Sequence, residues 1–413
     1  LHYASYLAII FFLIHGVFAN PVLKTGALID FFDSGKLFTE ACAVICIALI
    51  VWRIIFGRKL RNNAIKNNAA LQLKKPSWHG YLKVIEIIEI TPTIKTFRLA
   101  LPDGKKLPFK FLPGQYLSFR IKSGEGFVAR SYSISSMPYQ KYFCDISVKY
   151  LEGGRGASFL HTKVNVGDSL QCSGPQGVFT FIGKESNSLV MIAGGIGITP
   201  LLSVLKYLAK KNWQHDVYLL LSVRTPANIL FQEELQEISR RYSHLKLLIL
   251  PASIVGFSWD GPHGRINSKH LIDFIPQIHH RRIHLCGPEP MMEATKIALQ
   301  SLGVSDSQIY TEAFSSSGKI VDDSTVDARI TFKTSNKSCF AQAGKTLLEA
   351  AEEAGIFVES SCQSGFCGAC KLKVLVGQVK MHRDEALTRS DLENNRVLAC
   401  QARPISSHVE VEA

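Results

Sequence analysis

The sequence lacks several features that would place it in other functional classes. It contains no nucleic-acid-binding motif, although its 413 residues carry a net charge of +13, so we expect no nucleic-acid partner. Its ten cysteines form one cluster and are otherwise scattered, which is typical of a reducing compartment rather than of a disulfide framework. Long disorder is not expected either, because 46% of the residues are hydrophobic and only 20% are charged.

Two apolar stretches lie near the N-terminus, over residues 1–18 and 37–56. Each is about long enough to span a bilayer core of roughly 30 Å. Several Lys and Arg but no acidic residue follow between Gly57 and Pro76, which by the positive-inside rule orients the rest of the chain toward the cytoplasm. The sequence therefore predicts a transmembrane hairpin over residues 1–56, a basic linker over 57–77, and a location in the inner, cytoplasmic membrane.

Two alternatives concern the first apolar stretch. It could be a cleaved signal peptide, because Val17-Phe18-Ala19 fits a small-residue cleavage site, but a basic region before it is missing. His2 and His15 could also bind haem. One helix does not present them as a close pair, and packing or interfacial histidines are commoner.

From Trp78 onward the pattern changes to short runs of alternating polarity separated by Pro and Gly, which predicts six strands of a small antiparallel barrel over residues 78–185. The expected strands are Tyr81–Ile90, Ile94–Leu101, Tyr116–Ile121, Ser131–Ser135, Phe143–Tyr150 and Ser169–Cys172. On a strand, Arg130 and Tyr132 share one face. A guanidinium suits a phosphate and a phenol suits stacking on a flavin.

A glycine-rich turn, Gly153 to Ser158, precedes an expected helix. Glycines at a helix start leave backbone N–H groups free to bind a pyrophosphate, and this favours FAD over FMN. Either Ala157 or Ser158 could occupy the phosphate-contacting position.

Residues 186–314 predict a parallel α/β domain. An apolar run, 188–193, is followed by the loop Gly194-Gly195-Ile196-Gly197-Ile198-Thr199-Pro200 and by leucines at helical spacing. Strand, glycine loop and helix are the geometry of dinucleotide binding, although the loop is not GxGxxG. Further strands, Val217–Val223 and Arg282–Cys286 among them, alternate with helices. The last of these strands ends at a turn, Cys286-Gly287-Pro288, which joins it to a helix that contains Met291.

A polar linker, 315–327, leads to a third domain over residues 328–413. It contains Cys362, Cys367 and Cys370, and Cys400 lies thirty residues further on. This C-x₄-C-x₂-C…C spacing is that of plant-type [2Fe–2S] ferredoxins, which have a β-grasp fold. Zinc would accept four thiolates as well, but four-residue spacing within a Gly/Ser loop and a distant fourth cysteine fit an iron–sulfur cluster better.

The chain resembles the ferredoxin–NADP reductase superfamily in Phe111–Tyr116, in the segments just described around Arg130 and Gly154, and in the two nicotinamide-domain turns. The resemblance implies that the arginine and tyrosine hold the flavin, that the Cys-Gly-Pro turn lies by the nicotinamide, and that Phe314 lies near the flavin ring. The implied cofactor-binding residues are Arg130, Ser131, Tyr132, Ser133, Val148, Lys149, Gly156, Ala157, Ser158, Gly194, Gly195, Gly197, Thr199, Arg224, Cys286, Gly287, Pro288 and Met291. The implied catalytic residues are Tyr132, Ser133, Thr199, Cys286 and Phe314.

This domain order predicts an NAD(P)H:acceptor oxidoreductase. A nicotinamide gives a hydride, a [2Fe–2S] cluster accepts one electron, and a flavin handles both, so the flavin must lie between them. The expected acceptor is a protein such as a membrane-bound oxygenase, hydroxylase or desaturase; a quinone reductase and a non-catalytic membrane redox sensor are the alternatives. NADH is slightly favoured over NADPH, because Arg224 is the only arginine near the turn that could approach a 2′-phosphate.

Overall fold

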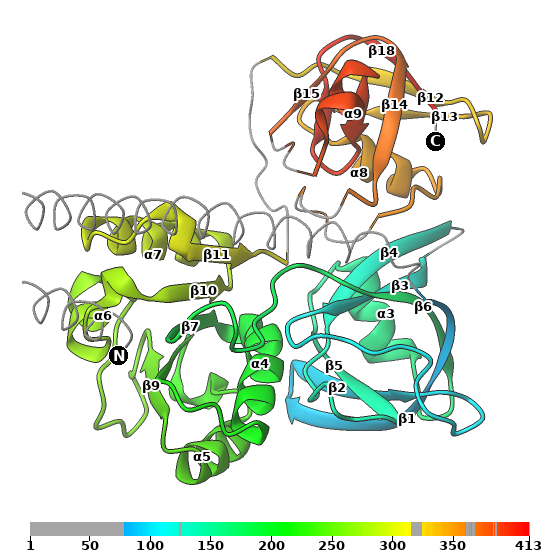
Figure 1. The fold of residues 1–413 in the computed structure, drawn as a ribbon. Helices are drawn as coiled ribbons and strands as arrows, with labels where there is room; N and C mark the ends of the chain where they lie inside the picture. Colours follow the sequence, from blue (N-terminus) through cyan, green and yellow to red (C-terminus); the bar gives the residue numbers. More distant parts are fainter. Residues whose placement is uncertain are drawn as a thin grey trace, which may run out of the picture. The chain divides into compact units, whose positions relative to one another are not determined.

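The computed structural model describes residues 78–412 except 124–125, 315–323, 361–362, 364, 366–367, 383 and 385. Ser77–Ala413 group into one compact unit. The unit contains three main sheets, which follow one another along the chain. In Figure 1 they run from blue and cyan through green and yellow to orange and red.

The first sheet is the predicted antiparallel barrel, with the strand order β4-β3-β6-β1-β2-β5. An isolated antiparallel bridge between Ile134 and Ile146 joins its two ends. The strands are β1 (Trp78–Thr91), β2 (Ile94–Ala100), β3 (Tyr116–Ser123), β4 (Gly126–Ser133), β5 (Phe143–Lys149) and β6 (Ser169–Gln176), with helix α3 (Arg155–Lys163) before β6. The prediction began β4 at Ser131, but its hairpin pairing with β3 extends back to Gly126.

The second sheet is entirely parallel, with the order β11-β10-β7-β8-β9. Its elements are β7 (Leu189–Gly194), α4 (Ile198–Lys210), β8 (Val217–Val223), α5 (Gln232–Arg241), β9 (Leu245–Pro251), α6 (Ser268–Phe274), β10 (Arg282–Cys286), α7 (Glu289–Ser301) and β11 (Ile309–Glu312). Alternate residues of β7 face opposite sides: Met191 joins a core with α4 and α5, whereas Ile192 joins one with α6 and α7. Both faces are therefore covered, which explains why β7 is apolar throughout.

The third domain has a mixed sheet in the order β13-β12-β18-β14-β16, with a small pair β15-β17. Its elements are β12 (Ala328–Phe332), β13 (Lys337–Ala341), α8 (Leu347–Glu353), β14 (Lys371–Val376), β15 (Val379–Met381), α9 (Arg389–Glu393), β16 (Arg396–Leu398), β17 (Ala402–Pro404) and β18 (His408–Glu412). Thr346 begins α8 with a capping box to Glu349. The apolar side chains of α8 pack into the domain's core with Ile330 and Val409.

The predicted transmembrane hairpin and basic linker lie outside the described residues, and so do the signal-peptide and haem alternatives. Within the part of the chain that the structure describes, no helix is long and apolar enough to cross a membrane. The predicted fold class, which counted two transmembrane helices, is wrong in that respect, and the predicted membrane anchoring and membrane location are withdrawn. An apolar run of about 20 residues meets the length requirement for a span, but length and apolarity alone do not establish one.

Candidate active site

A cavity of about 490 Å³ brings together residues from all three domains. Strand β4 contributes the predicted flavin residues Arg130 to Ser133, and the turn before α3 contributes residues 153–157. Thr199 and Phe314 come from the parallel α/β domain, and Glu352 and Gln363 come from the third domain. Side chains that the sequence assigned to the flavin and to the nicotinamide thus share one space with residues of the third domain.

The turn before α3 lies directly against β4. A Cβ on Gly156 would come within 2.6 Å of Arg130 Cγ and 3.2 Å of Tyr132 Oη, so only a glycine leaves this contact undisturbed. Helix α3 has no acidic residue in its first turn, so no carboxylate of the helix itself offsets the positive end that faces the cavity. The cradle between this turn and β4 fits a phosphate-bearing cofactor.

Tyr132 and Arg130 have different environments within that cradle. The Tyr132 ring packs against Phe119, with 5.8 Å between ring centroids, and burial raises the pKa of its phenol, so the group stays neutral. The Arg130 guanidinium donates to both carboxylate oxygens of Glu352 on α8, at 2.7 and 2.9 Å. These two side chains are 26% and 10% exposed. This ion pair holds the guanidinium in place, and Glu352 occupies one donor on each of its two terminal nitrogens.

The nicotinamide side lies at the point where the strand order of the parallel sheet reverses. The chain proceeds from β7 to β8 and β9 on one side and then returns to β10 and β11 on the other. The two predicted loops follow the neighbouring strands β7 and β10, at their carboxyl ends, where ligands of such sheets bind. A Cβ on Gly197 would collide with the Cys286 carbonyl, and Gly194 lies against Met291 and Pro288. The two loops are therefore in backbone contact.

Thr199 and Cys286 are both buried at this junction. Thr199 Oγ1 donates to the Ile196 carbonyl at 3.0 Å, and Ile196 itself lines the cavity. Burial raises the pKa of the Cys286 thiol well above its ordinary value, and the nearby Glu312 carboxylate adds to that effect. The thiol is therefore neutral and suits a neighbour of an apolar ring rather than a nucleophile.

Three family models match successive parts of the chain. They describe an oxidoreductase FAD-binding domain at residues 81–181, an oxidoreductase NAD-binding domain at 191–296 and a 2Fe-2S iron-sulfur cluster binding domain at 330–404. A relative from Chromohalobacter salexigens, the glycine betaine monooxygenase reductase subunit, is 31% identical over 80% of this chain and 94% of its own length. The chain belongs to the ferredoxin–NADP reductase-like oxidoreductases with a fused 2Fe-2S domain.

Two further proteins share this domain organisation with the reductase. The ferredoxin reductase component of the Rhodococcus rhodochrous 3-ketosteroid-9-alpha-monooxygenase is 30% identical over 80% of this chain and 96% of its own length. The solved structure of phthalate dioxygenase reductase has the same fold, with a TM-score of 0.59 and 24% identity over 81% of this chain and 98% of its own. The cofactors of the reductase are accordingly FAD, a nicotinamide coenzyme and a 2Fe-2S cluster.

Two of the four predicted cluster ligands lie among the described residues. Cys370 and Cys400 are buried, and their Sγ atoms are 3.3 Å apart, well beyond a disulfide bond of about 2.05 Å. Two sulfurs bound to one tetrahedral ion at about 2.3 Å would be nearly as close as this, so the pair fits one iron of a cluster. Cys362 and Cys367 lie outside the described residues.

Ten of the predicted cofactor-binding residues do not line this cavity. Seven of them belong to the two nicotinamide turns: Gly194, Gly195, Gly197, Cys286, Gly287, Pro288 and Met291. The other three are Val148, Ser158 and Arg224. Val148 is buried in the barrel core. Ser158 is half-buried and donates to the Leu151 carbonyl at 3.0 Å, whereas Ala157 lines the cavity. Arg224 is exposed just after β8. Their assigned roles stay predictions.

The sequence analysis missed the acidic wall of the cavity. Glu349, Glu352 and Glu353 lie on α8 of the 2Fe-2S domain and, with Gln363 of the same domain, line a space otherwise built by the other two domains. No local pattern distinguishes these glutamates from the solvated face of a short helix, because Arg130, the partner of Glu352, is 222 positions away in the chain.

Proposed function

We propose that this reductase draws a hydride from NAD(P)H and delivers single electrons through its 2Fe-2S domain to the terminal component of an oxygenase system. The observation that carries the proposal is the one cavity lined by β4, by the nicotinamide loop and by α8. Two of its relatives are named as reductase components of monooxygenases, and this supports an oxygenase as the acceptor.

Bound FAD would supply the chemistry that converts a two-electron donor into a source of single electrons. Arg130 and the N–H groups at the start of α3 would hold its phosphates, and the neutral Tyr132 phenol would pack on its ring. Thr199 would orient the nicotinamide from the other side of the cavity. The buried, neutral Cys286 thiol keeps charge and water away from the point of transfer.

Two contacts would keep the segment around Gln363, next to the predicted cluster ligands, beside strand β4, which carries the flavin motif. Gln363, which follows the predicted ligand Cys362, donates to the Ala129 carbonyl at 3.3 Å, and the Arg130–Glu352 pair ties α8 to the same strand. Gln401 Nε2 lies 3.7 Å from Cys400 Sγ, and such N–H groups near cluster sulfurs influence the potential.

Cys400→Ser tests the proposed electron order. We expect the purified variant to lose its cluster absorbance and its NAD(P)H-driven reduction of cytochrome c, a protein acceptor, while ferricyanide reduction continues because ferricyanide can take electrons from the flavin. Cys339→Ser is the matched control: Cys339 is a free, part-buried thiol of the same domain and should retain both activities. Equal loss of both activities in Cys400→Ser would contradict the order.

The acceptor and the coenzyme need separate measurements. For the coenzyme, the turnover rate of the wild type is measured with NADH and with NADPH. We expect the rate to be higher with NADH if a 2′-phosphate can reach no cation but the exposed Arg224. Arg224→Gln should then leave the NADH rate unchanged.

For the acceptor, a terminal oxygenase component should accelerate NADH oxidation and couple it to product formation. A wild-type protein that binds FAD but does not turn over with any acceptor would refute the proposed function.

A further inference from the structure

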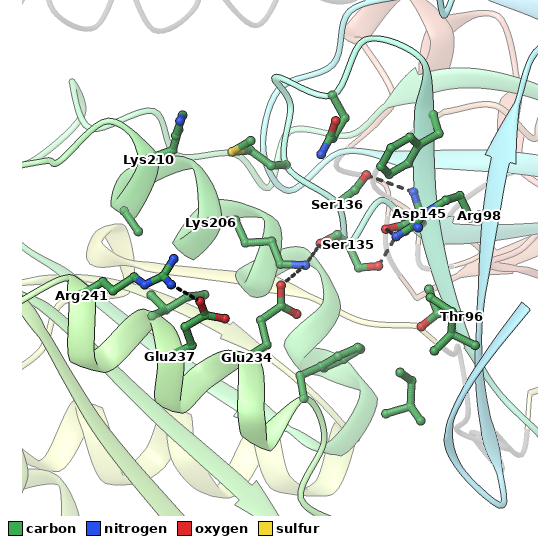
Figure 2. Close-up of a pocket in the computed structure, with 18 of the residues that line it drawn as sticks. Thr96, Arg98, Ser135, Ser136, Asp145, Lys206, Lys210, Glu234, Glu237 and Arg241 are labelled. Atoms are coloured by element: carbon green, nitrogen blue, oxygen red, sulfur yellow. Dashed lines mark hydrogen bonds and ion pairs between the residues drawn. The ribbon is translucent and has the colours of Figure 1, made fainter. Parts of the chain in front are cut away.

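A second cavity, of about 560 Å³, lies where the barrel meets the parallel α/β domain. Figure 2 shows six of its charged residues in pairs: Arg98 with Asp145 at 2.9 Å, Lys206 with Glu234 at 2.9 Å, and Arg241 with Glu237 at 2.7 Å. Because these charges neutralise one another across its walls, the cavity is organised as a junction between two domains rather than as an ion-binding site.

Helix α4 presents a stripe of polar side chains to this junction. Thr199, Ser203 and Lys206 are spaced i, i+4 and i+7 along the helix and therefore share a face. Thr199 lines the active-site cavity. Ser203 is fully buried and its Oγ donates to the Ser136 carbonyl at 2.7 Å. Lys206 Nζ donates to the Ser135 carbonyl at 3.1 Å.

The segment that receives these two hydrogen bonds continues directly from β4, which carries the flavin motif. It is also fixed from its other side by β5. The Ser135 N–H donates to the Asp145 carbonyl at 2.8 Å, and the Asp145 N–H donates to Ser136 Oγ at 3.0 Å. Lys206 is held in turn by Glu234 on α5. The end of β4 is thus clamped between β5 and α4.

We propose that Ser203 and Lys206 are positioning residues, which fix the distance between the flavin strand and the nicotinamide loop for hydride transfer. In that step the C4–H bond of the dihydronicotinamide breaks, and its hydrogen and both electrons pass to the oxidised flavin. The coenzyme is oxidised and the flavin is reduced. One turn of α4 separates Thr199 from Ser203, so a shift at the clamp displaces Thr199 directly. Such transfers are steep in distance, and a misplacement of about 1 Å can cost 100-fold.

This inference rests on the reductase activity proposed above, and its test separates the two. Stopped-flow reduction of the FAD-loaded full chain is measured with NADH and with NADH deuterated at C4, for wild type, Ser203→Ala, Lys206→Met and Lys206→Arg. Lys210→Met is the matched control, because Lys210 is exposed on the same helix and has no hydrogen bond or ion pair with any residue that the structure describes.

We expect Ser203→Ala and Lys206→Met to slow flavin reduction at saturating coenzyme by about tenfold and to increase the primary deuterium isotope effect. The coenzyme Kd and the flavin absorbance should stay as in wild type, and Lys206→Arg should restore most of the rate. A merely structural role would lower the melting temperature without changing the isotope effect. The proposed positioning role would be refuted if the rates and isotope effects of Ser203→Ala and Lys206→Met were unchanged, or if Lys210→Met lost the same fraction of its flavin reduction rate. A wild type that NADH fails to reduce would instead refute the function.

Discussion

The two glycine-rich turns of this reductase look alike in sequence but differ in what surrounds them. The turn before α3 faces a cavity, and its Gly156 meets the side chains of Arg130 and Tyr132. The turn before α4 faces backbone: the position of a Cβ on Gly197 is occupied by the Cys286 carbonyl, with Gly287 Cα at 2.8 Å. Side chains can move aside, whereas two packed backbone segments cannot.

The comparison shows that a glycine-rich turn before a helix can have two different physical roles. In the barrel, glycine leaves room for a ligand beside the Arg130 and Tyr132 side chains. In the parallel domain, glycine lets two loops from neighbouring strands touch, and that contact shapes the nicotinamide site. Substitutions at the two turns should therefore separate ligand affinity from fold stability.

Gly197→Ala should have the largest effect. Its methyl group would overlap the Cys286 carbonyl, so the loops must part, and we expect a loss of about 3 kcal/mol in the free energy of unfolding of the NAD-binding domain, with NAD(P)H reactivity lost as well. Urea unfolding monitored by fluorescence measures the first quantity. Gly195→Ala is the control from the same loop: its Cβ would meet open space, so only left-handed backbone strain of about 1 kcal/mol is expected. Equal losses in the two variants would contradict the close-packing argument.

Gly156→Ala should produce the reverse pattern. Because the added methyl meets the Arg130 and Tyr132 side chains rather than backbone, we expect a smaller loss of unfolding free energy than in Gly197→Ala, about 1 kcal/mol. We also expect a roughly tenfold weaker affinity for FAD, equivalent to about 1.4 kcal/mol. Titration of the flavin-free protein with FAD, followed by flavin fluorescence, gives the dissociation constant. If FAD bound as tightly as in wild type, the turn would not form part of the flavin cradle.

The smallest effect concerns the loss of folding stability at low pH that we attribute to His284, a residue of the parallel sheet. His284 on β10 is fully buried among Phe179, Phe181 and Tyr310, and its Nε2 lies 3.0 Å from Arg282 Nε. Burial, with the Arg282 charge second, lowers its pKa well below the ordinary 6.5. The unfolded chain therefore binds a proton below pH 6.5 that the folded chain does not, so stability is complete above pH 6.5 and falls as the pH drops below it.

His284→Phe should remove this pH dependence of the unfolding free energy, because a phenylalanine side chain cannot bind a proton. Wild type should lose up to about 1.4 kcal/mol per pH unit below pH 6.5 through this residue, and the variant should lack that slope. Urea unfolding at pH 7.5 and pH 5.5 compares them. Parallel losses in the two proteins would show that His284 does not account for acid sensitivity.

Local patterns predicted much of the fold. Strands β8 and β10 begin and end where the sequence placed them, at Val217–Val223 and Arg282–Cys286. For β8 the reason is that a buried parallel strand is a short apolar run with sharp ends. The start of β4 was missed because its outer residues alternate weakly. The membrane prediction failed because it relied only on the length and hydrophobicity of two segments, 1–18 and 37–56, and these two properties alone do not establish a membrane span.

Periodicity, glycine turns and cysteine spacing, together with the resemblance to the ferredoxin–NADP reductase superfamily, predicted the three domains and their cofactors. These features could be found in the sequence because each of them extends over a few neighbouring residues. The tertiary structure alone decided which residues meet. Glu352 reaches Arg130 across 222 positions, Gly197 touches the turn at Cys286, and the Ser203 hydroxyl meets the Ser136 carbonyl. Such contacts depend on how separate elements pack, and a pattern read along one segment contains no information about its distant partner.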